Sequence, residues 1–309
     1  NITYMKIVFI GGVRFSHAIL EIILKENIQI DAVFSYDKSK EKNYSDYISF
    51  DEITKRHKIK HIEVMNINDT KNVKLINEIQ PDIIFVFGWS QLLNNEILKI
   101  PKLGVIGSHP TELPKYRGRA PIPWSIIKGL KKSALTFFYI QEGIDDGDII
   151  LQKQFDIADV DDATSLYEKM TILGKKMLIE ILQLLESGQI ISKKQNPKLF
   201  IENWSKRTPL DGKIDWSKPA KEIHNLIRAT TFPYPGAYTF FKNKKLIIWK
   251  SRLDTSIIQE PGKIIIQNNQ VKIGTSNGSV FLDTVSYDCN ENKNGIEIFS
   301  SSDNGMKLE

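Results

Sequence analysis

The chain has 309 residues, 41% of them hydrophobic and 26% charged, which is the length and composition of a globular protein with room for two domains. Its formal net charge of +5 mildly favours anionic ligands such as nucleotides, phosphates or RNA without choosing among them. The single cysteine, Cys289, excludes an intramolecular disulfide framework, and no apolar run is long enough to span a membrane, so we expect a cytoplasmic protein without a membrane partner.

Strand and helix patterns alternate in the N-terminal half. The predicted elements, in chain order, are a strand at 6–12, a helix at 16–25, a strand at 30–36, a helix at 52–57, a strand at 62–65, a helix at 71–79 and a strand at 82–87. This alternation predicts an α/β fold with a doubly wound, mostly parallel sheet. The polar, lysine-rich stretch 37–46 is predicted to be a solvated loop. The glycines after the first strand lack the G-x-G-x-x-G fingerprint, so we interpret them as a packing feature.

A histidine followed by a proline marks the end of a further apolar stretch. Pro110 holds the backbone of His109 in an extended conformation and prevents a helix there. A histidine held rigidly where a strand ends can act as a general acid or base near neutral pH. The alternative is a core or surface histidine with one hydrogen bond, and two further segments favour the catalytic interpretation.

The first of these segments is EGIDDGDI at 142–149, directly after a predicted strand at 134–140. Asp145 stands there between two glycines, so the backbone can turn tightly around a small ligand. The second segment follows the histidine and carries Arg117, Gly118 and Arg119 before a helix start punctuated by prolines. Each segment alone is a weak signal, and their order along the chain makes them specific.

Together these three pieces resemble the formyltransferase family that uses 10-formyltetrahydrofolate. The family pattern is Asn-x-His-Pro, then Leu-Pro-x-x-Arg-Gly, then Gly-x-Asp-x-Gly, and its members act on methionyl-tRNA or on nucleotide-linked amino sugars. One departure concerns the catalytic asparagine of the family, because this chain has Gly107 at that position. Residues two apart in an extended segment share a face, so Gly107 should lie beside His109 while Ser108 points away.

The resemblance implies a role for each of the central residues. His109 would serve the oxyanion or proton transfer, and Asp145 would relay protons and tune the histidine. Losing one oxyanion donor typically costs about a hundred- to a thousandfold in rate. Either another group therefore donates in this chain, or Gly107 makes room for a different acyl group.

The resemblance also places the pterin of 10-formyltetrahydrofolate between the loops 87–93 and 139–145, largely on backbone groups. The candidate residues for this site are Phe87, Trp89, Leu92, Tyr139, Glu142 and Gly143. For Phe87 and Trp89, packing in the core is an equal alternative.

Arg117 and Arg119 are candidates for a phosphate of the acceptor, although each is nearly as well suited to bracing the loop through backbone carbonyls. We expect no bound metal, because His57 and His61 stand four residues apart without a third ligand at a suitable position.

The acceptor is predicted from the region 36–50. Members that act on transfer RNA usually carry a long basic loop there. In this chain the region is short, and Asp46 and Asp51 balance the charge of its lysines. We therefore expect a small nucleotide-sugar substrate rather than nucleic acid. The sequence also allows a homodimer. The alternatives are a methionyl-tRNA formyltransferase, an N-acyltransferase with another donor admitted by Gly107, and a non-catalytic folate- or nucleotide-binding protein.

The predicted domains are a catalytic domain at 5–190, a linker at 191–204 and a C-terminal domain at 205–309. The C-terminal part combines a predicted helix at 220–229 with five short strands and turn signals, which favours a small, OB-like β-barrel. Its Asp-Gly-x-Ile-Asp-Trp and Pro-Tyr-Pro-Gly-Ala stretches, at 211–216 and 233–237, resemble the C-terminal domain of the same family.

Overall fold

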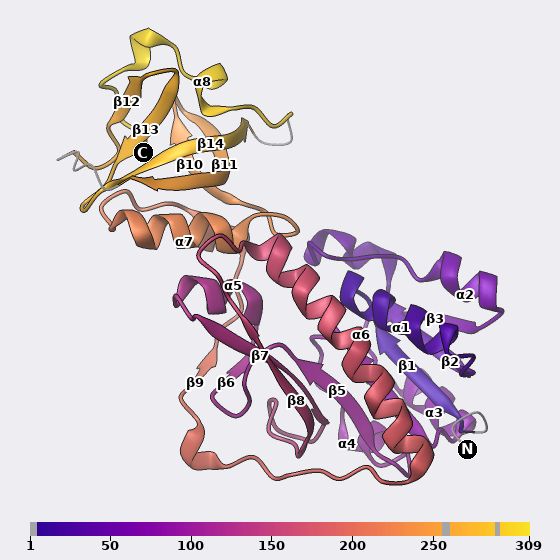
Figure 1. Cartoon of the computed structure of the whole chain (residues 1–309). Helices are drawn as coiled ribbons and strands as arrows, with labels where there is room; N and C mark the ends of the chain where they lie inside the picture. Colours follow the sequence, from indigo (N-terminus) through magenta and orange to yellow (C-terminus); the bar gives the residue numbers. More distant parts are fainter. Residues whose placement is uncertain (1–4, 255–259, 288–290) are drawn as a thin grey trace. The chain divides into compact units, whose positions relative to one another are not determined.

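The computed structural model describes residues 5–254, 260–287 and 291–309, so Cys289 lies outside the described residues. The chain divides into two compact units (Figure 1). Unit 1 takes in the described residues up to Pro121, together with Lys132–Asp156 and Glu168–Ser205. Unit 2 consists of Ile122–Lys131, Ile157–Tyr167 and the described residues from Lys206 onward. Within the part of the chain that the structure describes, no helix combines the length and the apolar character of a membrane span.

Unit 1 is built on a seven-stranded sheet in the order β3-β2-β1-β4-β5-β7-β8. Its strands are β1 Ile7–Gly11, β2 Ala32–Tyr36, β3 Lys60–Val64, β4 Ile83–Phe87, β5 Val105–His109, β7 Lys132–Tyr139 and β8 Ile149–Asp156. The strands from β3 to β5 run parallel, whereas β7 is antiparallel to β5 and β8 is antiparallel to β7. The predicted mostly parallel sheet is confirmed.

Helices cover both faces of this sheet (Figure 1). They are α1 Arg14–Lys25, α2 Asp51–His57, α3 Thr70–Ile79, α4 Asn95–Leu98 and most of α6 Ala163–Ser187. Val73 and Ile76 of α3 and Ile97 of α4 share one apolar cluster with alternate residues of β1, β2, β4 and β5. On the other face, Phe15 of α1 packs edge-on against Phe87 of β4. The fold is therefore doubly wound, as the alternation of strands and helices predicted.

The glycines that follow β1 are explained by packing within the protein. A Cβ atom on Gly11 would lie 2.5 Å from Cβ of Ser16, and one on Gly12 would lie 2.3 Å from the ring of Tyr36. The Ser16 hydroxyl accepts hydrogen bonds from the amides of Gly12 and Val13 at 3.0 and 2.9 Å. Side chains of the protein thus fill this turn, in agreement with the packing interpretation.

Two stretches predicted to be irregular contain short elements. Residues 38–43 of the predicted solvated loop form the 3₁₀ helix η2 (Lys38–Asn43), whose first turn is capped by Asp37 accepting from the amide of Ser39 at 2.9 Å. The predicted linker 191–204 belongs to unit 1 and contains η3 (Pro197–Leu199) and β9 (Glu202–Trp204). Strand β9 pairs in parallel with β6 (Tyr116–Gly118).

Unit 2 contains a five-stranded antiparallel sheet in the order β10-β11-β14-β13-β12. Its elements are most of α5 Pro121–Ile127, η4 Pro209–Gly212, α7 Ala220–Thr230, β10 Ala237–Phe241, β11 Lys244–Asp254, β12 Ile264–Gln267, β13 Gln270–Gly274, β14 Ser279–Tyr287, α8 Gly295–Ile298 and η5 Ser301–Asp303. Ile223 and Ile227 of α7 pack with Trp216 and the inward residues of the strands to form the core of this unit.

The last residues of the chain join the two outer strands of this sheet. Glu309 exchanges backbone hydrogen bonds of 3.0 and 3.2 Å with Phe240 of β10, while Ile264 of β12 donates to the carbonyl of Met306 at 2.8 Å. This segment closes the five-stranded sheet, so the predicted small β-barrel is present in unit 2.

Candidate functional site

His109 is the last residue of β5 and is 5% exposed. Its Nδ1 lies 3.6 Å from Oδ2 of Asp145. Its Nε2 is buried and has no hydrogen-bond partner among the described residues. A buried polar atom without a partner is uncommon in folded proteins, and at a strand end it indicates a group that meets a ligand. The imidazole thus has one nitrogen facing a carboxylate and the other available to a bound molecule.

The loop after His109 is held by side chains of the neighbouring strands. The hydroxyl of Thr136, which lies opposite His109 on β7, donates to the carbonyl of Thr111 at 2.7 Å. Gln152 of β8 donates to the carbonyl of Leu113 at 3.0 Å. These bonds tie the start of the 110–116 loop, directly after His109, to β7 and β8.

The Asp145 loop reaches His109 by turning back along the sheet. Because β7 is antiparallel to β5, its last residue, Tyr139, pairs with Ile106 near the start of β5. The chain then reverses, and the Asp145 carboxylate accepts a hydrogen bond from the amide of Gly118 at 2.9 Å. The sequence predicted that Asp145 and His109 would meet, but it did not show that this antiparallel strand makes the loop fold back.

The backbone of this loop depends on unusual conformations. Asp145 has φ of 50°, in the left-handed region that aspartate tolerates better than most residues. A Cβ atom on Gly147 would lie 1.7 Å from the carbonyl oxygen of Tyr139, so only glycine fits there. The tight turn expected from the two glycines is therefore present.

Gln195 contacts this loop from a distant part of the chain. Its Nε2 donates to the carbonyls of Asp145 and Gly147 at 2.7 and 2.8 Å, and its Oε1 accepts from Nη2 of Arg117 at 2.8 Å. No sequence signal marks this residue, because it is one polar side chain within a polar stretch that we predicted to be a linker.

The two arginines of the motif differ in their surroundings. The Arg117 guanidinium lies over the ring of Phe200 at 5.5 Å, and its Nε is buried without a hydrogen-bond partner among the described residues. Arg119 is exposed, and its amide donates to the carbonyl of Trp204 at 2.9 Å. Arg117 thus braces the loop through the side chains of Gln195 and Phe200, and not through the backbone carbonyls that were the alternative to a phosphate contact.

Trp204 supports the same loop from β9, and sequence reasoning did not single it out. Its ring stacks on Tyr116 with centroids 4.7 Å apart. A Cβ atom on Gly118, which has φ of 101°, would lie 2.3 Å from the carbonyl oxygen of Trp204. The glycine of the Arg-Gly pair is therefore required by the close approach of β9.

The side chains of Phe87 and Trp89 pack within unit 1. Phe87 is fully buried, with its ring 5.9 Å from Phe9 and 5.4 Å from Phe137, so any part it has in binding falls to its backbone. Trp89 stacks on Tyr36 with centroids 3.9 Å apart, and its buried Nε1 has no partner among the described residues. Core packing explains Phe87 completely, while Trp89 retains a polar atom that a ligand could use.

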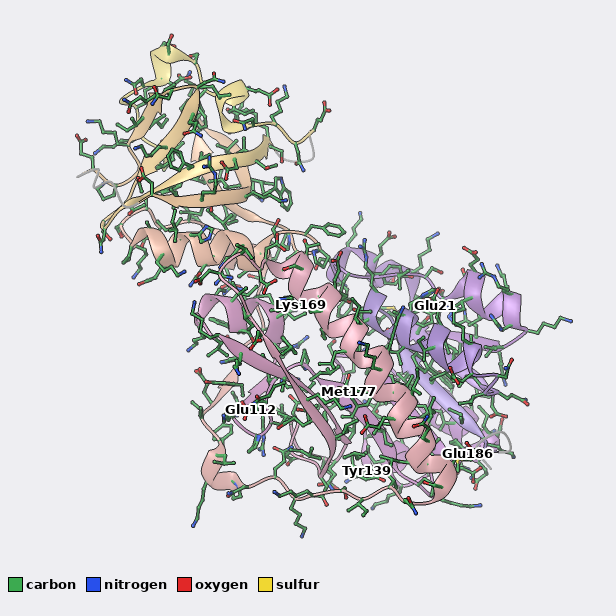
Figure 2. The ribbon with its side chains drawn as sticks, in the orientation of Figure 1. Glu21, Glu112, Tyr139, Lys169, Met177 and Glu186 are labelled. Carbon is green, nitrogen blue, oxygen red and sulfur yellow. The ribbon has the colours of Figure 1, made fainter. Side chains whose placement is uncertain are left out.

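The remaining predicted folate contacts lie on the two loops. Leu92 is 58% exposed, Glu142 is exposed, and Tyr139 is half-buried at the end of β7 (Figure 2). Burial raises the pKa of the Tyr139 hydroxyl further above the neutral range. A Cβ atom on Gly143 would lie 1.9 Å from a carboxylate oxygen of Asp146, an exposed side chain that can turn away, so this contact alone does not require glycine.

Gly107, the departure from the family motif, is buried in β5 and pairs with Val86 of β4 and Phe138 of β7. It lies on the same face as Val105, which belongs to the apolar cluster packed by Ile140. Ser108 therefore points to the other face, as predicted, and does not replace the missing asparagine.

Comparison with known proteins identifies the family. Residues 5–182 match the formyl transferase family, and residues 206–302 match the formyl transferase C-terminal domain. The chain belongs to the formyl transferase family. It is an enzyme of this family, whose typical formyl donor is a folate.

Curated relatives of this formyltransferase carry more than one name. The methionyl-tRNA formyltransferase of Clostridioides difficile strain 630 is 35% identical over 285 residues, which cover 91% of this chain and 92% of the relative. The bifunctional polymyxin resistance protein ArnA of Wigglesworthia glossinidia brevipalpis is 33% identical over 300 residues. That match covers 96% of this chain but only 45% of ArnA, so the chain spans less than half of the longer relative.

Solved structures share the fold of this formyltransferase. The N-formyltransferase of Helicobacter canadensis, in complex with folinic acid and dTDP-3-aminofucose, has a TM-score of 0.70 at 23% identity and covers 90% of this chain and 98% of its own. The sugar 3N-formyltransferase WlaRD has a TM-score of 0.68 at 24% identity, covering 93% of this chain and 98% of its own.

A serine–histidine–aspartate arrangement lies elsewhere in unit 1 of this formyltransferase. His61 Nε2 lies 2.8 Å from the hydroxyl of Ser35, and His61 Nδ1 lies 3.1 Å from Oδ1 of Asp51. Ser35 lies inside β2, which is paired with both β1 and β3, and its hydroxyl, unlike Nε2 of His109, already has a hydrogen-bond partner. We interpret the group as structural. Among the described residues, no group of three or more His, Cys, Asp or Glu side chains is placed to hold a metal ion.

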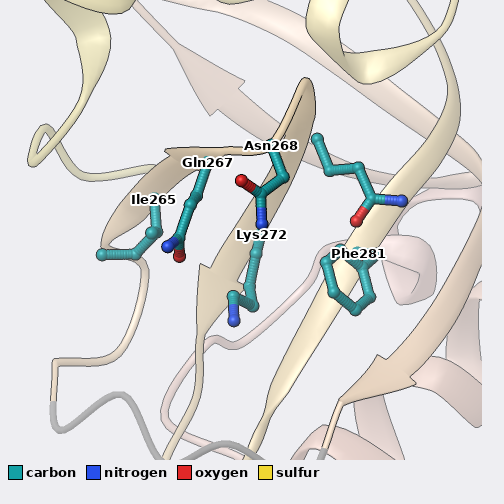
Figure 3. Close-up of a pocket in the computed structure, with 6 residues that line it drawn as sticks. Ile265, Gln267, Asn268, Lys272 and Phe281 are labelled. Atoms are coloured by element: carbon teal, nitrogen blue, oxygen red, sulfur yellow. The ribbon is translucent and has the colours of Figure 1, made fainter.

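A small hollow lies in unit 2 (Figure 3), and none of its lining residues is a predicted site residue. It encloses about 70 Å³ and is lined by Ile265, Gln267, Asn268, Gln270, Lys272 and Phe281. The Lys272 ammonium is paired with Asp254 at 2.8 Å, so its charge is already balanced. The hollow is too small for a nucleotide or a folate and has no reactive group.

Proposed function

We propose that this formyltransferase transfers the formyl group of 10-formyltetrahydrofolate to the amine of a nucleotide-linked amino sugar. The observation that carries the chemistry is the imidazole of His109, with Nδ1 facing Asp145 and Nε2 buried without a partner. Such a nitrogen can receive a proton or donate a hydrogen bond to an oxygen that becomes negative.

The reaction forms a C–N bond between the amine and the formyl carbon and breaks the C–N bond to the folate nitrogen. The amine loses one proton and the folate nitrogen gains one, while the formyl oxygen passes through an oxyanion. We assign the stabilisation of this oxyanion and a share of the proton transfer to His109. Asp145 orients the imidazole by its charge across their 3.6 Å separation, and it relays the proton when the two groups close to hydrogen-bond distance in the substrate complex.

The donor is proposed to bind between the loops 87–93 and 139–145. The buried indole nitrogen of Trp89 and the backbone of these loops are the groups suited to the pterin, because the side chain of Phe87 is confined to the core. The exposed guanidinium of Arg119 is suited to a phosphate of the acceptor.

The choice of a sugar acceptor rests on the segment 37–50. Its three lysines, at 38, 40 and 42, are matched by three acidic residues at 37, 41 and 46. The segment is also anchored, since Lys40 donates to the carbonyl of Met65 at 2.7 Å and the ring of Tyr44 stacks on Tyr36 at 4.2 Å. A charge-balanced, anchored segment lacks the basic stripe that would hold the phosphates of transfer RNA.

Methionyl-tRNA is the second candidate acceptor, because several relatives that are 30–37% identical carry the name methionyl-tRNA formyltransferase. This candidate predicts RNA binding with a steep dependence on salt. The sugar candidate predicts instead that a nucleotide sugar stabilises the native protein by preferential binding.

The test offers a panel of nucleotide-linked amino sugars and methionyl-tRNA to the enzyme together with either 10-formyltetrahydrofolate or acetyl-CoA, and mass spectrometry identifies the product. Addition of a formyl group to a sugar supports the proposal, formylation of methionyl-tRNA supports the second candidate, and addition of an acetyl group overturns the donor assignment. Thermal shifts with dTDP-sugars, UDP-sugars and bulk transfer RNA at moderate salt give an independent measure of acceptor binding. The His109→Asn variant is the control, because it should bind but not turn over.

A further inference from the structure

The side chain of Gln195 is fully engaged in hydrogen bonds around the Asp145 loop. Both hydrogens of its amide are positioned for donation, to the carbonyls of Asp145 at 2.7 Å and Gly147 at 2.8 Å. Its oxygen accepts from Arg117 at 2.8 Å. Gln195 thus connects two segments that are separated from it by 50 and 78 residues.

These two segments are the ones that place the Asp145 carboxylate. Arg117 immediately precedes Gly118, whose amide donates to Oδ2 of Asp145 at 2.9 Å. The same oxygen lies 3.6 Å from Nδ1 of His109. Gln195 therefore holds the backbone of the carboxylate's own loop and, through Arg117, the strand that supplies the carboxylate's other anchor.

The Asp145 loop needs such a restraint because its conformation is costly. Asp145 has φ of 50°, a left-handed conformation that a residue other than glycine keeps only where its surroundings hold it. Gly147 has high intrinsic freedom as a glycine, so the turn would sample other conformations without hydrogen bonds to its carbonyls.

Gln195 is itself anchored on both sides. Lys193, two residues earlier, exchanges two backbone hydrogen bonds of 2.8 Å with Ile149 at the start of β8. Asn196, directly after it, caps η3 by accepting from the amide of Lys198 at 3.1 Å. A glutamine fixed at its own backbone can impose a position on the loop, rather than follow it.

We propose that Gln195 is a positioning residue for formyl transfer, which acts by holding the Asp145 carboxylate beside His109. This inference rests on the proposed roles of His109 and Asp145. It assigns a function to the 188–205 segment, which would otherwise be only a connection within unit 1.

The first experiment compares Gln195→Ala with Gln195→Glu. Glutamate keeps an acceptor for Arg117 but cannot donate to the carbonyls of Asp145 and Gly147. If these two donated hydrogen bonds hold the loop, both variants should lose activity to a similar extent. We expect kcat to fall by about ten- to a hundredfold with KM for the donor changed less than about threefold, because a displacement of about 1 Å at a reacting group has costs of this order. Gln189→Ala, at an exposed glutamine of the same segment, is the matched control and should retain wild-type kinetics.

The second experiment tests whether Gln195 acts through Asp145. In an Asp145→Asn background, Gln195→Ala should lower kcat by less than about twofold, since its target has already been removed. An equal loss of kcat in both backgrounds would show that Gln195 acts independently of Asp145 and would overturn the inference.

A third measurement is independent of any acceptor. The ring nitrogen signals of His109 in ¹⁵N-labelled protein, assigned with the His109→Asn variant, should shift in both Gln195 variants and stay unchanged in Gln189→Ala. Unchanged His109 signals in folded Gln195 variants would contradict the proposal. If the wild-type protein formylates no amine, the proposed function is refuted. If the His109 signals still shift in the Gln195 variants, the positioning of His109 by Gln195 is supported independently of that function.

Discussion

A Cβ atom on Gly107 would lie 2.5 Å from Cδ1 and 2.9 Å from Cγ1 of Ile140. The carbonyl oxygen of Val86 would be 3.1 Å away. The side chain of Ile140 therefore fills the space in which the family's asparagine would begin. The backbone of Gly107 does not have the positive φ that would itself disfavour a side chain.

The first prediction follows from this contact. Gly107→Asn alone should lower formyl transfer, because overpacking a buried position costs about 1–3 kcal/mol and displaces β5 beside His109. Gly107→Asn combined with Ile140→Ala should raise kcat about tenfold or more above Ile140→Ala alone, if the carboxamide restores a missing oxyanion donor. Steady-state kinetics of the four proteins measure this directly.

Ile140→Ala is the control for this experiment, since it removes apolar packing at a cost of about 2 kcal/mol and adds no donor. A double variant no faster than that control would mean that another group already serves the oxyanion. An unchanged rate in Gly107→Asn would show that the position is catalytically idle and that the crowding is relieved without cost.

The second prediction concerns His109. Replacement by asparagine or alanine should reduce kcat by about two to four orders of magnitude, the range associated with a positioned general acid or base. The variant should still unfold cooperatively at a similar temperature, because the lost imidazole Nε2 makes no hydrogen bond with the described residues. His57→Asn, at an exposed position of α2, is the matched control. Near-wild-type turnover in a folded His109 variant would show that this histidine has only a structural role.

The third prediction concerns Asp145. Asparagine tolerates the left-handed conformation at this position and can still accept from the amide of Gly118, so Asp145→Asn removes the charge with little change of backbone. We expect kcat to fall far more than the affinity for the donor, as for a group needed in the transition state. Asp146→Asn, at the exposed neighbour, provides the comparison. If only the donor affinity changed, Asp145 would belong to the pterin pocket alone.

The elements of unit 1 were predictable because each carries its own local signal. Apolar strands separated by amphipathic helices indicated the doubly wound sheet, and the prolines and glycines around His109 and Asp145 indicated the two loops that meet. Both residues are marked by their immediate neighbours, which is why the sequence singled out each of them, and the resemblance to the formyltransferase family paired them.

Gln195, Trp204 and Ile140 were missed for a different physical reason. Each acts through a partner far along the chain, and no local pattern of the sequence indicates that partner. Strand β9 has only three residues and depends on pairing with β6, so its sequence resembles an irregular connection. The filling of the space beside Gly107 likewise depends on the reversal of the chain after β7, which requires the antiparallel pairing of that strand.

The last prediction concerns His224, on α7 of unit 2. Its Nδ1 lies 2.9 Å from the hydroxyl of Ser251 on β11. Burial, and then the positive charges of Arg228 and Lys221, lower the pKa of His224 to about 4. The unfolded chain binds a proton at this residue near its ordinary pKa of 6.5, whereas the folded chain does so only near 4. The free energy of unfolding should therefore be unaffected by His224 above pH 6.5 and should fall as the pH is lowered from 6.5 towards 4.

The size of this loss is about 1–2 kcal/mol near pH 4.5, less than the shift alone would give because part of the ring reaches solvent. His224→Gln should remove the contribution, so the stability of the wild type relative to the variant should decline over this pH range and stay constant above it. Urea unfolding at a series of pH values measures the difference, with His57→Gln at an exposed site as the control. An NMR titration of the His224 ring gives its folded pKa directly, and a midpoint near 6.5 would show that α7 and β11 do not shield this histidine from water.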